Sequence, residues 1–216
     1  MASSALKMTA KDRAYEFTKG RVLDSTFAGG DLITEGEVAA ALGMSRTPVR
    51  EAFLRLEGEG LLRLYPKRGA LVVPVSVGEV EAVMETRMLV ERFALDKLLA
   101  AGPAPTIAAA MDERIALQEE HASAGDADGF AAVDREFHTV FVTAAGNPIV
   151  LSLYESLRDR QQRMGITALR REPRRLAEIL DEHRALTEAV AGGEVERTLE
   201  LLDAHLHGTL VLLREG

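Results

Sequence analysis

Four side chains in the second half of the chain have the types and spacing of a metal site: Asp134, His138, His183 and His205. Asp134 and His138 are four residues apart, so on one helix their side chains point the same way. His183 and His205 fall in the middle of two later predicted helices, and three helices of a bundle can converge on one point. One carboxylate with three imidazoles suits Zn²⁺ or Ni²⁺, with Mn²⁺ less favoured. The alternative is that each histidine is structural or exposed.

A second set of residues opens a predicted helix near the start of the chain. Ser45 is a good N-cap, and Thr47 with the proline after it suits the first turn of a helix continuing over residues 50–57. Arg46 and Arg50 share the exposed side of this start. We predict that both arginines read guanine bases in a DNA major groove and that Ser45 and Thr47 lie on the same DNA-contacting surface. The alternative for each arginine is a solvated surface charge.

Two neighbouring segments extend this surface. Thr34 is a cap for a helix over residues 35–41, and Thr34 and Glu35 lie where backbone amides can meet a phosphate. Residues 61–65 and 70–73 are predicted strands of a hairpin whose turn carries basic residues. We predict that this hairpin is a wing that touches DNA through its turn residues Lys67, Arg68 and Gly69. Ordinary solvated loop charges are the alternative.

Charge is distributed unevenly along the 216 residues, whose net charge is −8. Residues 1–78 carry 11 Lys/Arg and 9 Asp/Glu, which gives +2, whereas residues 79–216 carry 15 and 25, which gives −10. The acidic excess therefore lies outside the predicted DNA-contacting segment, where clustered basic residues can still meet phosphates.

The composition excludes several classes of site and of protein. The absence of cysteine excludes disulfides and thiolate metal sites. No apolar run approaches the roughly 20 residues of a membrane span, and the start of the chain lacks the layout of a signal peptide. We expect a soluble, cytoplasmic protein without a membrane partner.

The run Pro74–Gly78 marks a predicted domain boundary, because proline and glycine interrupt regular structure. Residues 1–8 are expected to be a loose tail, and 11–27 a first helix. We predict a mainly α protein with an N-terminal domain over 1–74 and an all-α antiparallel bundle over 79–216. The bundle helices are predicted at 77–100, 105–124, 127–144, 148–170, 173–191 and 194–214.

Residues 32–73 resemble the winged helix-turn-helix of the GntR family of bacterial repressors. The positions that carry this resemblance are Leu32, Glu35, Val38, Ala39, Leu42, Gly43, the run from Ser45 to Ala52, Leu56, Glu59, Gly60, Leu61 and Gly69. Residues 79–214 resemble the helical ligand-binding (FCD-type) domain of the FadR subfamily. The matching positions there are Arg87, Glu91, Asp134, Phe137, His138, Asn147, His183 and His205.

The resemblance implies a homodimer that binds a short palindromic operator in double-stranded DNA. It also supports the four-residue metal site and implies that a small organic acid binds beside it. Arg87 and Asn147 are the predicted effector-binding residues, against a salt bridge with Glu91 and a helix cap as their respective alternatives. Gly36 departs from the family pattern, which often has a basic residue there, so the operator is not expected to copy that of a relative.

These observations predict a transcriptional regulator, most simply a repressor, controlled by a small carboxylate at a metal site. A direct sensor of the metal ion is the first alternative. A metal-dependent enzyme is a weaker one, because no general base accompanies the site and the DNA-binding module would be unexplained.

Overall fold

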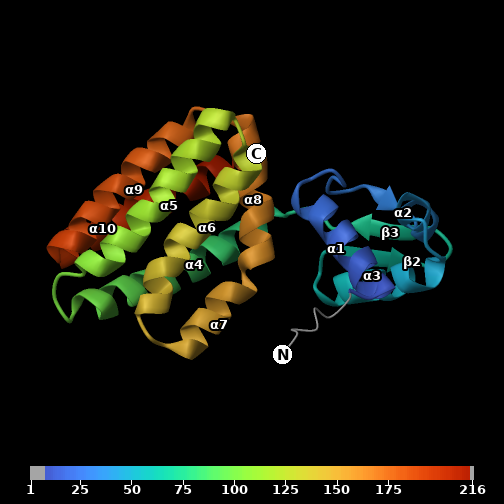
Figure 1. The fold of residues 1–216 in the computed structure, drawn as a ribbon, viewed down its shortest axis with the longest axis horizontal. Coiled ribbons are helices and arrows are strands. Elements are labelled where there is room, and N and C mark those ends of the chain that lie inside the picture. Colours follow the sequence, from blue (N-terminus) through green and yellow to red (C-terminus); the bar gives the residue numbers. More distant parts are fainter. Residues whose placement is uncertain (1–7, 215–216) are drawn as a thin grey trace, which may run out of the picture. The chain divides into compact units, whose positions relative to one another are not determined.

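The computed structural model describes residues 8–214, without the side chains of Thr167 and Arg171. The chain divides into two compact units, and the division falls between Val75 and Ser76. Of the tail expected at residues 1–8, only Met8 lies within the described residues. The predicted fold class is confirmed: helices dominate, and the first unit carries a small antiparallel sheet (Figure 1).

The first unit is a winged helix-turn-helix. Its elements are α1 (Ala10–Leu23), β1 (Leu32–Ile33), α2 (Glu35–Leu42), α3 (Arg46–Gly58), β2 (Leu62–Tyr65) and β3 (Gly69–Val72). The strands pair antiparallel in the order β1-β3-β2, so the predicted hairpin gains a third strand. Gly43 ends α2 with a φ of +61°, a left-handed conformation that glycine adopts without penalty.

The apolar side of α3 anchors the helix in the core of this unit. Val49, Phe53 and Leu56, spaced so that they share one side of the helix, are each at most 1% exposed. Burial of each side chain contributes roughly 1.5–3 kcal/mol. This packing fixes α3 while the opposite side, with Arg46 and Arg50, stays exposed.

Three details of this unit refine the prediction. α3 begins at Arg46, directly after the predicted N-cap Ser45, and ends at Gly58, so both arginines lie within the helix. Ser45 has the extended backbone of an N-cap, but its side chain makes no capping hydrogen bond. α1 ends at Leu23 instead of residue 27, because the chain turns there and Ser25 adopts a positive φ of 61°.

The second unit is an all-α bundle. Its helices are α4 (Val77–Leu99), α5 (Pro105–Ala124), α6 (Ala127–Ala144), α7 (Pro148–Ser156), α8 (Arg158–Arg171), α9 (Arg175–Gly192) and α10 (Val195–Arg214). The helix predicted over 148–170 is therefore wrong: it is two helices, separated at Leu157. The Leu157 amide bonds to Tyr154 O at 3.1 Å, three residues back, which tightens the turn. No glycine or proline marks this break.

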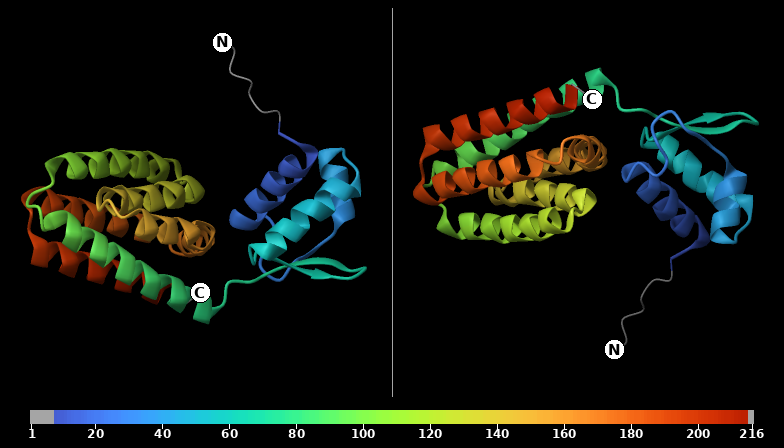
Figure 2. Two further views of the ribbon diagram at one scale, coloured as in Figure 1. Left: turned by 90° about the horizontal axis from the view of Figure 1, so that it is seen from below. Right: turned by 90° about the horizontal axis from the view of Figure 1, so that it is seen from above.

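Helix α6 lies at the centre of the bundle. It packs against α4, α5, α7 and α8, while α9 contacts α5 and α10, and α10 contacts α4. Figure 2 shows these helices running alongside one another within the bundle. Phe130, Phe137 and Phe141 on α6 are fully buried. The interior is thus built around α6, the helix that carries Asp134 and His138.

Candidate functional site

A groove runs between α3 and the β2–β3 hairpin in the first unit. Among the residues predicted to contact DNA, those that line it are Thr34, Glu35, Arg46, Arg50, Lys67, Arg68 and Gly69. Ser45 and Thr47 are exposed at the start of α3 but do not belong to the lining. The fold thereby brings the start of α2, the start of α3 and the hairpin turn to one surface.

Arg46 and Arg50 are held only loosely on this surface. The Arg46 guanidinium lies over α2, where a Cβ atom added to Gly36 would be 3.4 Å from Arg46 Nη2. Arg50 Nε is 3.8 Å from Glu35 Oε1, an exposed ion pair worth roughly 0–1 kcal/mol. Both guanidinium groups can therefore exchange these contacts for bases or phosphates at little cost.

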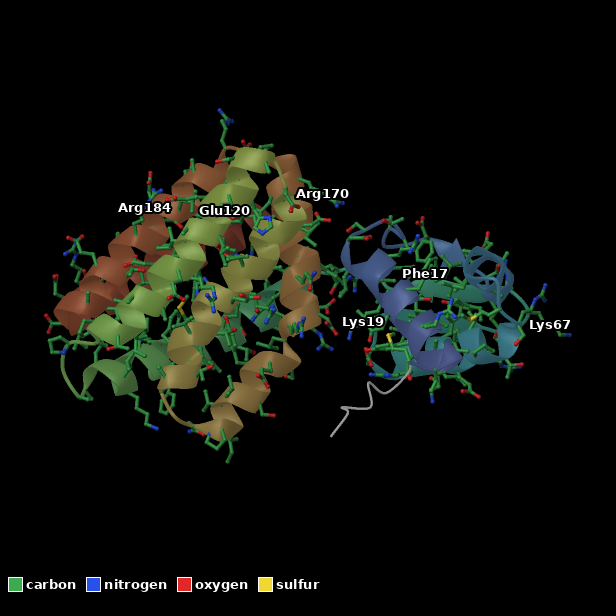
Figure 3. All side chains as sticks on the ribbon, viewed as in Figure 1. Phe17, Lys19, Lys67, Glu120, Arg170 and Arg184 are labelled. Carbon is green, nitrogen blue, oxygen red and sulfur yellow. The ribbon has the colours of Figure 1, made fainter. Side chains whose placement is uncertain are left out.

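The hairpin turn has an unusual backbone at its tip. It is closed by a hydrogen bond from Arg68 N to Tyr65 O of 3.0 Å, and its third residue, Lys67, has a φ of +62°. That conformation costs a side-chain-bearing residue roughly 1–2 kcal/mol, so a lysine there indicates a use for its charge. Figure 3 shows Lys67 projecting from the tip. Gly69 has a structural role: a Cβ there would be 2.4 Å from Ile33 O.

Thr34 begins α2 with the predicted capping box. Its Oγ1 accepts from Glu37 N at 3.2 Å, and Glu37 Oε2 accepts from Thr34 N at 2.8 Å. The amides of Glu35 and Gly36 lie in the first turn, where no intrahelical acceptor is available. They are the backbone donors that a phosphate could reach.

Three histidines meet inside the second unit. His138 comes from α6, His183 from α9 and His205 from α10, and all three are at most 3% exposed. One ring nitrogen of each lies within 4.8 Å of those of the other two. Asp134, one turn before His138, places Oδ1 3.6 Å from His183 Nε2. The structure therefore brings together the three predicted histidine ligands, with the fourth predicted ligand, Asp134, beside His183.

Each histidine is backed by a polar side chain at Nδ1. The contacts are His138 to Glu91 Oε2 at 2.8 Å, His183 to Gln118 Oε1 at 2.9 Å and His205 to Glu182 Oε2 at 2.7 Å. The first is an ion-pair distance without the alignment of a hydrogen bond. Such partners hold the Nδ1 proton and leave the Nε2 lone pair free for a metal. Nε2 of His138 and of His183 is buried without a hydrogen-bond partner.

Two of these backing carboxylates are paired with arginines. Arg87 Nε donates to Glu91 Oε1 at 2.7 Å, and the Tyr154 hydroxyl donates to the same oxygen at 2.9 Å. Arg175 donates two hydrogen bonds to Glu182, of 2.6 and 2.8 Å. The centre is thus surrounded by charges that are already compensated, which is what burial of ions requires.

The surroundings set the protonation of the centre. Burial by itself raises the pKa of Glu91, but the charge of Arg87 outweighs it and the pKa falls below its ordinary value. Burial lowers the pKa of His183 well below its ordinary value, and also lowers that of His205. At neutral pH His183 and His205 are therefore neutral imidazoles, the form that binds metal ions.

This donor set fits a divalent transition metal. Metal–nitrogen bonds are about 2.0–2.1 Å, so nitrogens on a tetrahedral ion lie about 3.4 Å apart. The imidazole nitrogens, within 4.8 Å of one another, would approach by up to about 1.4 Å on binding. A metal ion would satisfy the two buried Nε2 atoms that have no other partner.

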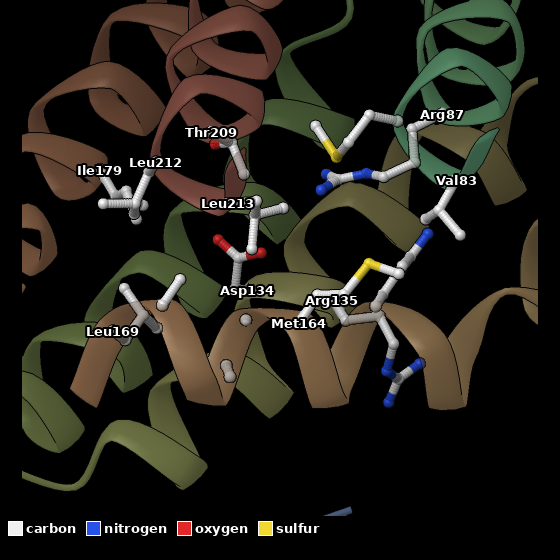
Figure 4. A pocket seen from close by; sticks show the side chains of 15 residues that line it. Val83, Arg87, Asp134, Arg135, Met164, Leu169, Ile179, Thr209, Leu212 and Leu213 are labelled. Atoms are coloured by element: carbon white, nitrogen blue, oxygen red, sulfur yellow. The ribbon is translucent and has the colours of Figure 1, made fainter. Parts of the chain in front are cut away.

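A cavity in the bundle opens onto Asp134. It lies among α4, α6, α8, α9 and α10, and Arg87 also lines it. Figure 4 shows Arg87 reaching in from α4 and Asp134 from α6. Because Arg87 bonds Glu91 through Nε, the salt bridge leaves its terminal nitrogens to face the cavity.

Asn147 does not share this site. Its Oδ1 accepts hydrogen bonds from the amides of Ile149 and Val150, at 3.1 and 3.3 Å, and so caps α7. It is not one of the residues that line the cavity. The structure favours the capping alternative over the predicted effector contact.

Two known domain families account for most of the chain. Residues 10–72 match the domain described as bacterial regulatory proteins, gntR family, and residues 82–208 match the FCD domain. The chain belongs to the GntR family. Its winged helix-turn-helix is the DNA-binding module of GntR regulators, and its bundle is an FCD domain, a type that can bind metal.

Curated relatives of this GntR protein are transcriptional regulators rather than enzymes. An HTH-type regulator of Agrobacterium vitis, from the TAR-I ttuE-ttuC' intergenic region, is 35% identical over 66% of this chain and 83% of its own. The gluconate operon transcriptional repressor of Bacillus subtilis is 24% identical over 82% of this chain and 73% of its own.

Solved structures share the fold. A GntR regulator from Rhodococcus sp. RHA1 has a TM-score of 0.80 at 21% identity, covering 97% of this chain and 99% of its own. The metal-free FCD domain of TM0439 has a TM-score of 0.51 at 24% identity, covering 65% and 95%. None of the helices within residues 8–214 combines the length and apolar composition that crossing a bilayer requires.

Proposed function

We propose that this GntR regulator is a homodimeric repressor whose affinity for a palindromic operator is controlled by a small carboxylate. The effector would bind beside a divalent metal held by Asp134, His138, His183 and His205, with Zn²⁺ or Ni²⁺ preferred and Mn²⁺ possible by ligand type. The observation that carries the proposal is the position of Asp134, which lines the same cavity as Arg87 and lies 3.6 Å from the buried Nε2 of His183 in the histidine cluster.

Arg87 is the proposed carboxylate anchor. Its terminal nitrogens and Asp134 face the same cavity (Figure 4), and a guanidinium pairs well with a carboxylate. When bound, the metal would supply a second positive centre for the carboxylate. The chain's own residues would orient the effector and exclude water from it.

Helix α4 offers the route from this site to the DNA-binding domain. It carries both Arg87 and Glu91, and only the four-residue connection 73–76 separates its first residue, Val77, from the end of β3 at Val72. An effector controls DNA binding only if it favours one arrangement of the two domains. Contacts to Arg87 act directly on the helix that follows the connection.

The DNA-binding part is tested with a duplex selected from randomised DNA by the wild-type protein. Arg46→Ala or Arg50→Ala should abolish specific binding in a gel-shift assay, since each removes a proposed bidentate contact to guanine. Arg13→Ala removes the same charge from the exposed side of α1, outside the groove, and should bind normally. Unchanged specific binding by both groove variants would refute the proposed reading face.

The metal part is tested by calorimetric titration of the metal-free protein with Zn²⁺. Binding of one ion per chain with tight affinity, lost in His183→Gln, supports the site. A direct metal sensor is the second candidate function, and the buried triad itself favours it. In that case metal alone would switch operator binding and no carboxylate would alter it.

A further inference from the structure

The cavity beside Asp134 has two chemically different ends. In Figure 4, Arg87 lies on one side of Asp134, whereas Leu169, Ile179 and Leu212 lie on the other. These apolar side chains come from α8, α9 and α10. The polar end suits a carboxylate, and the apolar end suits hydrocarbon.

Charges near the polar end leave room for a single carboxylate. Arg87 is already matched by Glu91 at 2.7 Å. A divalent ion bound by Asp134 would keep one net positive charge, which one carboxylate balances. Arg135 also lines the cavity, but Glu136 on α6 and Asp159 on α8 carry two negative charges that offset those of Arg135 and of Arg158.

The cavity has few groups that could satisfy hydroxyls. Thr209 already donates its hydroxyl to His205 O at 3.0 Å. Gln161 Nε2 and Arg135 Nε are buried without hydrogen-bond partners, so these two donors on the lining are the ones that a ligand hydroxyl could use. A ligand with many hydroxyls would leave most of them unpaired, and each unpaired buried hydroxyl lowers affinity roughly tenfold.

We infer that the effector is a compact monocarboxylate with an apolar body, not a polyhydroxylated sugar acid; the inference rests on the proposed effector site. The cavity holds about 50 Å³ of free space, room for a few water molecules at roughly 10–15 Å³ each. A short aliphatic chain of a few carbons matches this size. Each methylene that enters the apolar end should strengthen binding about fourfold.

The test is calorimetric titration of the Zn²⁺-loaded full-length protein with acetate, propionate, butyrate, valerate and hexanoate, against glycerate, gluconate and succinate. Affinity should rise about fourfold per methylene until the apolar end is full. Gluconate should bind at least tenfold more weakly than butyrate. Gluconate or succinate binding as tightly as the best aliphatic acid would overturn the inference while leaving a carboxylate effector in place.

Failure of the underlying proposal has a different signature. Butanol and butyramide lack the carboxylate. If either bound with the same affinity as butyrate, the proposed carboxylate site would be refuted. Absence of heat from every acid in the series would do the same.

Gly165→Ala probes the cavity in a protein that should fold normally. Gly165 lines the cavity from α8, and its added Cβ would make an ordinary 3.5 Å contact with Ala131. The variant should prefer an acid about one methylene shorter than the wild type. Gly78→Ala, in α4 with open space around it, should keep the wild-type order. An unchanged chain-length preference in the Gly165 variant would overturn the placement of the apolar end.

Discussion

Replacement of Arg87 by methionine should sharply destabilise the metal-free FCD domain. Arg87 Nε lies 2.7 Å from Glu91 Oε1, and both side chains are at least 92% buried. At an effective dielectric of roughly 20, unit charges at this distance attract by about 6 kcal/mol. The Tyr154 hydroxyl, 2.9 Å from the same oxygen, keeps part of the stabilisation of Glu91. We therefore expect a loss of about 3–5 kcal/mol, the usual cost of leaving a buried charge unpaired.

Urea unfolding of the metal-free protein, followed by circular dichroism, measures this loss. Methionine keeps the length of the arginine stem, so the change isolates the charge. The matched control is Arg87→Met combined with Glu91→Gln, which removes both charges and should recover at least half of the lost stability. A loss below about 1 kcal/mol in the single variant, or no recovery in the double variant, would show that compensation of Glu91 is not what Arg87 contributes.

Three further outcomes follow from the two sites. His183→Gln should weaken Zn²⁺ binding by at least about a hundredfold, measured in competition with a chromogenic chelator. The control His121→Gln removes an imidazole that pairs with Asp126 away from the centre, and it should leave Zn²⁺ affinity unchanged. Equal losses in the two variants would contradict the proposed histidine site. In Lys67→Asn the asparagine tolerates the left-handed backbone but carries no charge. Operator affinity should therefore fall, and the slope of log affinity against log salt concentration should decrease in magnitude by about 1. An unchanged slope would mean that the tip of the hairpin makes no phosphate contact. Gly36→Ala should raise the melting temperature of the DNA-binding domain slightly. Alanine is worth up to about 1 kcal/mol over glycine inside a helix and less in the first turn, where Gly36 lies, and the added Cβ meets only the flexible end of an arginine, at 3.4 Å. A lower melting temperature would show that the space above Gly36 is structurally required.

The geometry of the proposed DNA-contacting surface could be predicted from sequence because it depends on local structure. Thr34 and Glu37 form their capping box within four residues of chain, and the turn at Gly43 sets α3 directly after α2. Helical spacing then decides that Val49 is buried and Arg46 is not. The start of α3 was predictable for the same reason, because Ser45 suits an N-cap and Pro48 suits the first turn after it.

At the candidate metal centre, only the clustering of the proposed ligands could be predicted from sequence. Asp134 and His138 share a helix, but Gln118 and Glu182 reach the centre from other positions of α5 and α9, where they resemble ordinary helix-surface residues. Their role depends on how helices pack, which helical periodicity does not report. The sequence did indicate a contact between Glu91 and Arg87, because they are four residues apart on one helix. That spacing is equally typical of a surface ion pair, so it did not predict that the pair is buried.

The size of the expected regulatory effect is compatible with this architecture. A change of about a hundredfold in operator affinity requires a coupling free energy of about 2.7 kcal/mol. One hydrogen bond to a charged group contributes roughly 1.5–3 kcal/mol. Rearrangement of a single contact of Arg87 is therefore sufficient in energy, provided that it occurs in only one arrangement of the domains. Because Glu91 on the same helix contacts His138 at 2.8 Å, α4 joins the cavity, the histidine centre and the start of the FCD domain in one rigid element, and no second path is needed to carry the signal to the connection.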